Sequence, residues 1–202
     1  MRPDMRRLLF AAALLLAAPL HAQAVPVDTL ARDSVRAPAD SVWVVDEERV
    51  DAYLGDLVSI EGVAWIAALG LWDHVRTEPD EWGGGADALA ARILSRGGGH
   101  VVRTSVRHGL AAALGRTTEY RPCGCDGPER RIAYAITETF TDYDAQGRRR
   151  LSTPFLAGTY AGALAPVLWH PDADAAEALQ SGTISLVWAI ANNILNELWT
   201  SP

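Results

Sequence analysis

The chain has 202 residues, of which 49% are hydrophobic, and a formal net charge of −7; its 18 basic residues are all arginine. This length is enough for one domain with its own core, and seven tryptophans together with the hydrophobic content exclude general disorder. The acidic balance argues against nucleic acid as a partner and against attraction to anionic lipid headgroups.

The first 24 residues have the pattern of a secretory signal peptide. Three arginines within the first seven residues precede a 13-residue apolar stretch, Leu8 to Leu20, and Ala22-Gln23-Ala24 has the form of a cleavage site. Thirteen helical residues rise about 20 Å, which is short of the ~30 Å hydrocarbon core, so we predict cleavage rather than a retained anchor. Removing residues 1–24 leaves a formal charge of −9. We therefore expect an exported protein of the periplasm or cell envelope.

The remaining chain divides into two parts. Residues 25–45 carry Pro26 and Pro38 among polar residues, and this composition predicts a flexible lead-in. From residue 46 to residue 202 the hydrophobic residues recur with helical spacing. We predict an all-α domain over 46–202, a bundle of five to six helices joined by Gly- and Pro-rich loops.

The first predicted helices lie in the N-terminal half of this domain. Acidic residues at 46–48 suit the start of a helix that is predicted to run toward Trp72. A second helical pattern begins at Ala86 and is predicted to end at Gly97-Gly98-Gly99, before a further apolar stripe over 102–114. Residues 115–128 are rich in Gly, Pro and Cys and predict a loop.

The C-terminal half is predicted to hold the remaining helices. A helical pattern follows Pro128, and residues 142–150 indicate a polar turn around Gly147. Thr153-Pro154 is a good helix start, and Pro166 is expected to bend or end that helix. Asp174 has the position of a cap for the longest helix, predicted over 175–199 and apolar nearly all round.

Two apolar segments raise the question of membrane association. Val63–Trp72 and Phe155–Trp169 contain ten and fifteen residues, fewer than the ~20 that a membrane span needs. The second has Gly158 and Gly162 at the small-xxx-small spacing that lets membrane helices approach closely, although soluble bundles also use it. The short lengths favour a soluble or peripherally attached protein over an integral one.

Cys123 and Cys125 are the only cysteines, and they are separated by Gly124. Export favours a structural disulfide or a metal ligand over free thiols. A bond that closes so small a ring would be strained, and strained disulfides are the more oxidising ones, which makes a redox dithiol the alternative. The Cys-x-x-Cys pattern of thioredoxin-like enzymes is absent. We predict a local staple or metal clip.

Other metal-ligand patterns are weak. His170, Asp172 and Asp174 offer three ligands in five residues, but aspartates before a helix are more often caps. Residues 142–147 begin like a calcium loop, yet Thr153 stands where that loop needs a bidentate Glu, so a hairpin or turn fits this segment better. We therefore predict no metal, no cofactor and no catalytic residue from these patterns.

One polar set near the cysteines has the residue types of an anion-binding cleft. Arginine binds carboxylate or phosphate with two parallel hydrogen bonds, although in an acidic chain it more often forms ion pairs. The set comprises Arg103, Arg107, Arg121, Arg130, Arg131, Glu119, Tyr120 and Tyr134. No serine has the nucleophile-elbow pattern, and no Gly-rich run has P-loop spacing.

Several short runs occur together along the domain. They are Glu81-Trp82-Gly83-Gly84-Gly85, Ser105-Val106-Arg107-His108-Gly109-Leu110, Glu119-Tyr120-Arg121-Pro122-Cys123-Gly124-Cys125, Tyr134-Ala135 with Thr139-Phe140-Thr141, Gly158-Thr159-Tyr160-Ala161-Gly162 and Ser181-Gly182-Thr183. In this order the chain resembles, over residues 50–199, an uncharacterised family of exported bacterial proteins with Gly- and Ala-rich helices. The resemblance implies export and a helical domain, and it implies no activity or catalytic residue.

Three functional hypotheses follow. The first is a non-enzymatic helical module of the cell envelope that acts through packing or through protein or membrane contact. The second is an exported hydrolase that uses the Arg/Glu/Tyr/His set near residues 100–134. The third is thiol–disulfide chemistry at Cys123 and Cys125. The sequence favours the first, since its helices are apolar and rich in small residues.

Overall fold

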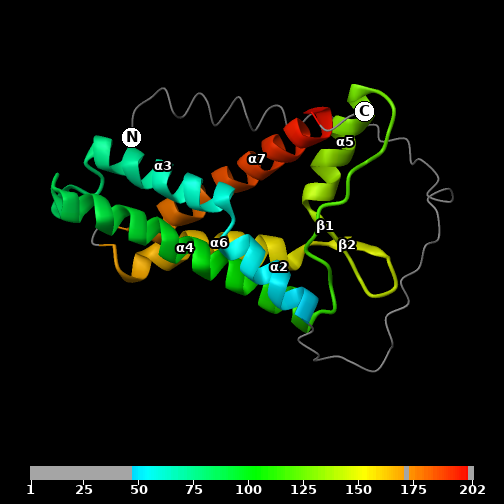
Figure 1. The fold of residues 1–202 in the computed structure, drawn as a ribbon, viewed down its shortest axis with the longest axis horizontal. Coiled ribbons are helices and arrows are strands. Elements are labelled where there is room, and N and C mark those ends of the chain that lie inside the picture. The colour runs from blue at the N-terminus through cyan, green and yellow to red at the C-terminus, as the bar shows by residue number, and fades with distance from the viewer. Residues whose placement is uncertain (1–46, 171–172, 200–202) are drawn as a thin grey trace. The chain divides into compact units, whose positions relative to one another are not determined.

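The computed structural model describes residues 47–170 and 173–199, all of which belong to the unit Arg36–Pro202. The predicted signal peptide and lead-in lie outside the described residues. Six α-helices and two short 3-10 helices occur in the described part (Figure 1): α2 (Glu47–Leu57), α3 (Ile60–Arg76), η1 (Asp80–Trp82), α4 (Ala86–Ala113), α5 (Pro128–Thr139), α6 (Thr153–Leu164), η2 (Ala165–Leu168) and α7 (Ala175–Trp199). The predicted number of helices is confirmed.

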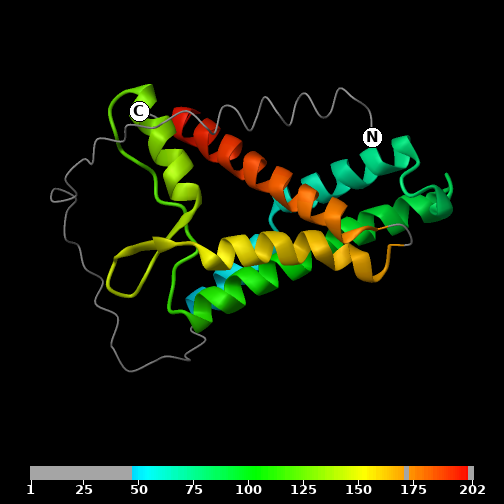
Figure 2. The same cartoon turned by 180° about the vertical axis from the view of Figure 1, so that it is seen from behind.

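The long helix α4 is the centre of the arrangement. It packs along α6 and also contacts α3 and α2 (Figure 1). Helix α7 packs on both α6 and α5 (Figure 2). Gly182, in the first half of α7, lies against Tyr160 of α6, whereas Asn193 in its second half donates a hydrogen bond to Thr139 of α5. Helix α7 therefore connects the α4–α6 layer to α5.

The first predicted helix is in fact two helices. Helix α2 ends at Leu57, and Ser59 caps α3 by accepting a hydrogen bond of 3.1 Å from the Gly62 N–H. Serine at this position satisfies one of the unpaired donors of the first turn, which fixes a new helix start that the apolar pattern did not reveal. Helix α3 then continues to Arg76, beyond the predicted end at Trp72, and Thr77 follows it in the left-handed region.

The prediction that Gly97-Gly98-Gly99 ends a helix is wrong. Helix α4 passes through all three glycines and joins two predicted helical segments. Their small size serves packing, because a Cβ at Gly99 would lie 3.0 Å from the Gly162 carbonyl oxygen of α6, and one at Gly98 would lie 3.1 Å from the Trp169 ring. Close approach of two helices outweighs the low helix propensity of glycine here.

The all-α prediction is confirmed in its main part, and the polar segment around Gly147, which fits a hairpin or a turn in the sequence, is a β-hairpin. Strands β1 (Thr141–Tyr143) and β2 (Arg149–Leu151) pair antiparallel, with Asp142 opposite Arg150. Gly147 supplies the positive φ, of 72°, that the turn needs. The Asp144 carboxylate accepts hydrogen bonds from the Gln146 and Arg148 backbone and from two arginine side chains. Asp144, which could have been a calcium ligand, is therefore hydrogen-bonded within the hairpin.

The predicted boundaries of the last two helices are confirmed, but the prediction that 175–199 is the longest helix is wrong, because α4 has 28 residues and α7 has 25. Ser152 accepts a hydrogen bond from the Phe155 N–H at the start of α6. Helix α6 ends at Leu164, and Pro166 lies in the 3-10 turn η2 that follows. Asp174 caps α7, since its carboxylate accepts a hydrogen bond of 3.2 Å from the Ala176 N–H.

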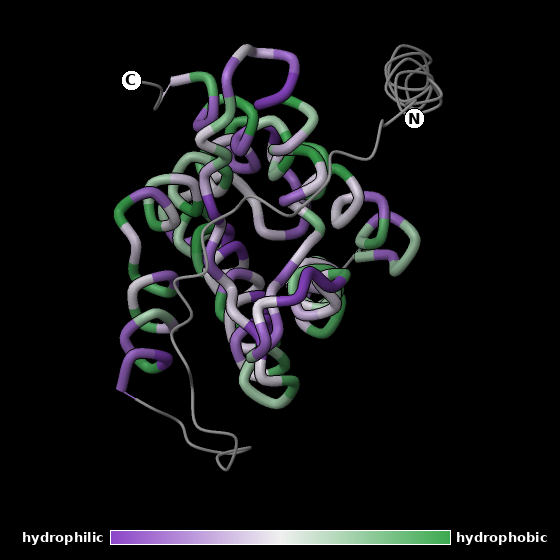
Figure 3. Tube along the Cα trace, turned by 90° about the vertical axis from the view of Figure 1, so that its right-hand side faces the viewer, coloured by the Kyte–Doolittle hydropathy of each residue, from purple (hydrophilic) through white to green (hydrophobic). Residues whose placement is uncertain are grey.

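The distribution of residues between inside and outside is unusual. Within the described residues, the buried hydrophobic residues are four alanines, Ala88, Ala111, Ala135 and Ala165, while eight polar or charged residues are buried. Large hydrophobic side chains are exposed on several helices, including Ile60, Trp72 and Trp188. Hydrophobic positions, green in Figure 3, are spread over many helical turns. Water-soluble bundles usually bury residues of this kind.

Candidate functional site

The cysteine loop between α4 and α5 is the first candidate site. Cys123 and Cys125 form a disulfide within it. The Cys123 N–H donates a hydrogen bond of 2.9 Å to the Glu197 Oε1, and the Tyr120 hydroxyl donates another of 2.9 Å to the same oxygen. On the other side, the Arg131 Nε donates a hydrogen bond of 2.7 Å to the Cys125 carbonyl. The loop is therefore held at both cysteines by charged side chains.

Glu197 was not anticipated as part of this site. It lies near the C-terminal end of α7 and is only 5% exposed. Burial, followed by the hydrogen bond to Glu197, raises the pKa of Tyr120 above its usual range. Tyr120 consequently remains a neutral hydrogen-bond donor at any physiological pH. In the sequence, Glu197 is one acidic residue among the polar positions of an apolar helix, and no local pattern connects it to the cysteines.

A second polar cluster lies where α5 meets the hairpin. Glu138 is buried, and its Oε2 accepts hydrogen bonds from Arg149, from Thr141 at 3.0 Å and from Tyr143 at 3.3 Å. Burial, followed by the charge of Glu138, raises the pKa of Tyr134 beside it. The Glu138 Oε1 is buried without a hydrogen-bond partner among the described residues. The cluster is an ion-paired interior, in which Arg149 compensates the buried carboxylate.

Asp142 is a further buried carboxylate, and its pKa gives a testable pH dependence. It is 8% exposed, and burial raises its pKa, although the Ser152 hydroxyl and Arg107 act in the opposite direction. An acid whose pKa is higher in the folded state than its unfolded value of about 3.9 binds its proton more tightly when folded. Its contribution to stability is therefore lost as the pH rises from the unfolded pKa through the folded pKa.

We expect Asp142→Asn to remove this pH dependence, because the amide has nearly the same shape and no charge. The free energy of unfolding of the variant, minus that of the wild type, should increase as the pH rises from acid to neutral. Urea unfolding followed by circular dichroism at a series of pH values measures this difference. A variant that loses stability relative to the wild type over the same pH range would show that the ionised carboxylate is favourable in the fold.

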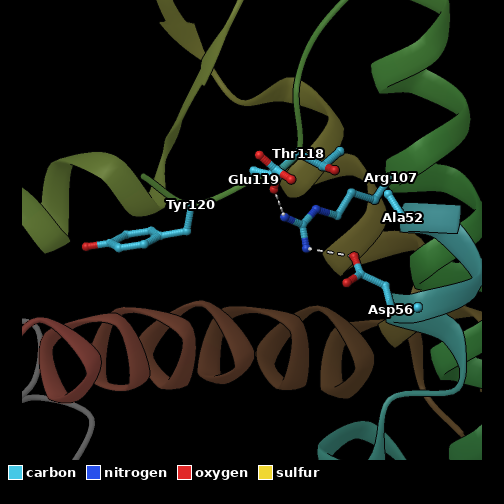
Figure 4. Close-up of a pocket in the computed structure, with 7 residues that line it drawn as sticks. Ala52, Asp56, Arg107, Thr118, Glu119 and Tyr120 are labelled. Atoms are coloured by element: carbon cyan, nitrogen blue, oxygen red, sulfur yellow. Dashed lines mark hydrogen bonds and ion pairs between the residues drawn. The ribbon is translucent and has the colours of Figure 1, made fainter. Parts of the chain in front are cut away.

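A pocket of about 380 Å³ opens between α2, α4 and the loop that leads to the cysteines (Figure 4). Asp56 of α2 and Arg107 of α4 face each other across it, with the Arg107 Nη1 4.0 Å from the Asp56 Oδ2. Arg107 also donates a hydrogen bond of 2.6 Å to the Thr118 carbonyl. Glu119 and Tyr120 complete the polar lining.

Asp56 also contacts two histidines of α4, His100 and His108. The His108 Nε2 lies 2.8 Å from the Asp56 carboxylate, and the His100 Nε2 lies 3.3 Å from the Asp56 carbonyl. Among the described residues, no group of three or more His, Cys, Asp or Glu side chains is arranged to hold a metal ion. The contacts of Asp56 join α2 to α4, which is a structural role.

The predicted anion-binding set is divided among several places. Arg107, Glu119 and Tyr120 share the pocket. The other members have separate surroundings. Arg103 lies beside Ser185 of α7, and Arg121 stacks on the Tyr143 ring. Arg131 contacts Cys125, Arg130 is exposed, and Tyr134 lies near Glu138. The hydrolase hypothesis needs these groups around one concave site. The pocket holds Arg107, Glu119 and Tyr120, and His108 contacts its Asp56, while the other members of the set lie elsewhere.

The remaining predicted ligands have structural neighbours. His170 packs against the Trp82 ring, with 5.0 Å between ring centroids, and Asp174 caps α7. Asp172, the third member of that set, lies outside the described residues.

No family model, curated protein or solved structure matches this chain. The resemblance to exported bacterial proteins with Gly- and Ala-rich helices therefore stays a prediction.

Proposed function

We propose that the chain is a non-enzymatic helical module of the cell envelope that docks on a membrane surface through exposed hydrophobic residues of α3 and α7. The observation that carries the proposal is the reversed distribution of residue types. The buried hydrophobic residues of the described part are alanines, and the large ones face outward. Large exposed hydrophobic side chains in such number are typical of proteins that contact lipid or another protein.

The outward-facing residues are concentrated on two helices, and we call their large hydrophobic side chains the apolar surface. On α3 these are Ile60, Val63, Trp65, Leu69, Leu71, Trp72 and Val75, and on α7 they are Leu179, Ile184, Val187, Trp188, Leu195, Leu198 and Trp199. Trp65 and Trp188 join the two parts, with ring centroids 6.4 Å apart. Tryptophan is favoured at membrane interfaces, since its ring is apolar and its N–H is polar.

Lipid is favoured over a protein partner by the way in which the helices pack. Small residues bring the helices together: a Cβ at Gly70 would lie 2.6 Å from the Ile93 side chain, and one at Gly182 would lie 2.7 Å from the Tyr160 ring. Buried polar groups such as Glu138 are paired inside. Glycine contacts and internal polar bonds, with large apolar residues outside, are the packing mode of helices in lipid.

The length of the apolar stretch supports attachment to one leaflet. In the described part of the chain, one helical stretch, Glu47–Arg76, is long and apolar enough to cross a membrane, judged by length and composition alone. This stretch is interrupted at Val58 and Ser59. The uncharged run within α3, Gly62 to Trp72, rises only about 16 Å, against a hydrocarbon core of ~30 Å. Such a helix suits the interface of one leaflet.

Flotation with vesicles tests the proposal. The chain carries net negative charge and no lysine, so we expect it to float with zwitterionic phosphatidylcholine vesicles and to gain nothing from anionic lipid. Replacing Trp65 and Trp188 together with Gln should lower the bound fraction about tenfold or more, because burying one aromatic side chain contributes about 1.5–3 kcal/mol.

The matched control is Leu151→Gln. Leu151 is also a large exposed hydrophobic residue, but it lies on the hairpin. The Leu151→Gln variant should float like the wild type. Failure of the wild type to float, or equal flotation of the double variant, would overturn the proposal. If instead the chain forms a concentration-dependent dimer that the double variant abolishes, the apolar surface is an interface between copies and the lipid proposal is wrong.

A further inference from the structure

The disulfide holds only its own loop, which makes a purely structural role a weak explanation for it. Cys123 and Cys125 are two residues apart, so the bond connects no two helices or strands. In the loop-entropy account a disulfide stabilises a fold less when it closes a shorter loop. Both cysteines are partly accessible, and their neighbours Pro122, Gly124 and Asp126 are exposed. The segment that carries the disulfide is therefore in part open to solvent.

The two sulfur-bearing residues have different electrostatic surroundings. The Arg131 guanidinium is held against residue 125 by its hydrogen bond of 2.7 Å to the Cys125 carbonyl. Residue 123 is tied instead to a carboxylate, through the hydrogen bond of 2.9 Å from its N–H to Glu197. A cation stabilises a thiolate beside it and makes that sulfur the better leaving group. The pair is therefore asymmetric, with Cys125 on the side that favours a departing thiolate.

We propose that the Cys123–Cys125 disulfide is a site of thiol–disulfide exchange that accepts two electrons from a dithiol. A thiolate of the dithiol attacks the Cys123 Sγ, a new S–S bond forms there, and the Cys123–Cys125 bond breaks. Cys125, whose backbone carbonyl holds the Arg131 guanidinium, leaves as a thiolate and takes a proton from solvent. The second thiol of the dithiol, after losing its proton, attacks the mixed disulfide and releases Cys123 as a thiol. The dithiol is oxidised to a disulfide, and this chain is reduced.

Arg131 acts in this scheme as a positioning residue, and Arg130 provides its control. Arg130 is the adjacent arginine of α5 and is exposed, whereas Arg131 is partly buried against the loop. Both substitutions by Gln remove one positive charge from the same helix turn. Only Arg131→Gln removes the charge that is held at Cys125, so a difference between the two variants reports on that contact.

The first experiment measures the rate at which dithiothreitol reduces the folded chain at pH 7, with alkylation and mass spectrometry as the readout. We expect Arg131→Gln to react about threefold or more slowly than the wild type, Arg130→Gln to match the wild type, and Arg131→Lys to recover most of the rate. Equal rates for Arg131→Gln and Arg130→Gln would overturn the role of Arg131. Reduction that occurs only in urea would overturn the exchange site as a whole.

A second measurement tests the direction of attack. Glutathione attacks in the same way, and rapid alkylation of the released thiol traps the mixed disulfide before that thiol or a second glutathione resolves it. Peptide mapping of the trapped product then locates the adduct. The scheme places it on Cys123. A predominant adduct on Cys125 would contradict the assignment of the leaving sulfur. Neither experiment involves lipid, so the outcome is independent of the flotation result.

Discussion

Replacing Arg92 with Met should destabilise the fold by about 3–5 kcal/mol, because it removes three hydrogen bonds of a buried guanidinium and leaves the buried Pro79 carbonyl without its donor. Arg92 is 1% exposed on α4. Its guanidinium donates hydrogen bonds of 2.8 Å to the Glu78 and Pro79 carbonyls, and it lies 3.0 Å from the His74 Nδ1. These contacts fix the turn between α3 and α4. Urea unfolding followed by circular dichroism measures the loss.

Arg96→Met is the matched control for this prediction. Arg96 lies one turn further along α4 and forms two hydrogen bonds with Asp73, but its side chain is 41% exposed. An ion pair at such a position contributes about 0–1 kcal/mol. Similar losses for the two variants would mean that removal of an arginine from α4, rather than its buried carbonyl partners, determines the effect.

Gly162→Ala is the second substitution for which we expect a large effect, a loss of about 2–3 kcal/mol from overpacking. A Cβ at this position of α6 would lie 2.6 Å from the Arg103 Cβ and 2.7 Å from the Gly99 carbonyl oxygen of α4. Neither atom is the end of a flexible side chain, so the two helices must separate. Thermal unfolding of the variant tests the expectation.

The control for the helix contact is Gly109→Ala. Gly109 also lies within a helix, α4, but a Cβ there would meet no atom within 4 Å. This change should be neutral or should stabilise the fold by up to about 1 kcal/mol, since alanine has the higher helix propensity. A gain in stability at Gly162 as well would contradict the close helix contact.

Helical periodicity was sufficient to predict most of the fold. The cap at Asp174 and the proline at 166 placed helix boundaries correctly, because both act through local chemistry. The glycines at 97–99 were misinterpreted for a physical reason. Local propensity treats glycine as a helix breaker, and its use as a contact surface depends on α6, which lies far away in the sequence.

The sequence indicates a hairpin or turn around Gly147 but not the strands that flank it, because these are only three residues long and mostly polar. Alternation of hydrophobic and polar residues cannot be recognised over so few positions. The candidate site shows a similar limit. The two cysteines were evident from their spacing, yet their neighbour Glu197 is 74 residues away from Cys123. Tertiary packing of α7 on α5 brings the two together, and no local pattern encodes it.

The hydrogen bond between Cys123 and Glu197 also has a consequence for the order in which the molecule assembles. At about 5–20 residues per second, 74 residues separate the synthesis of the two partners by roughly 4–15 s. The cysteine loop is thus complete before its acidic anchor exists. A truncation of α7 before Glu197 would leave the cysteine loop chemically intact but without its hydrogen bond to α7. A mutation near the C-terminal end of the chain would therefore affect a loop that is synthesised earlier.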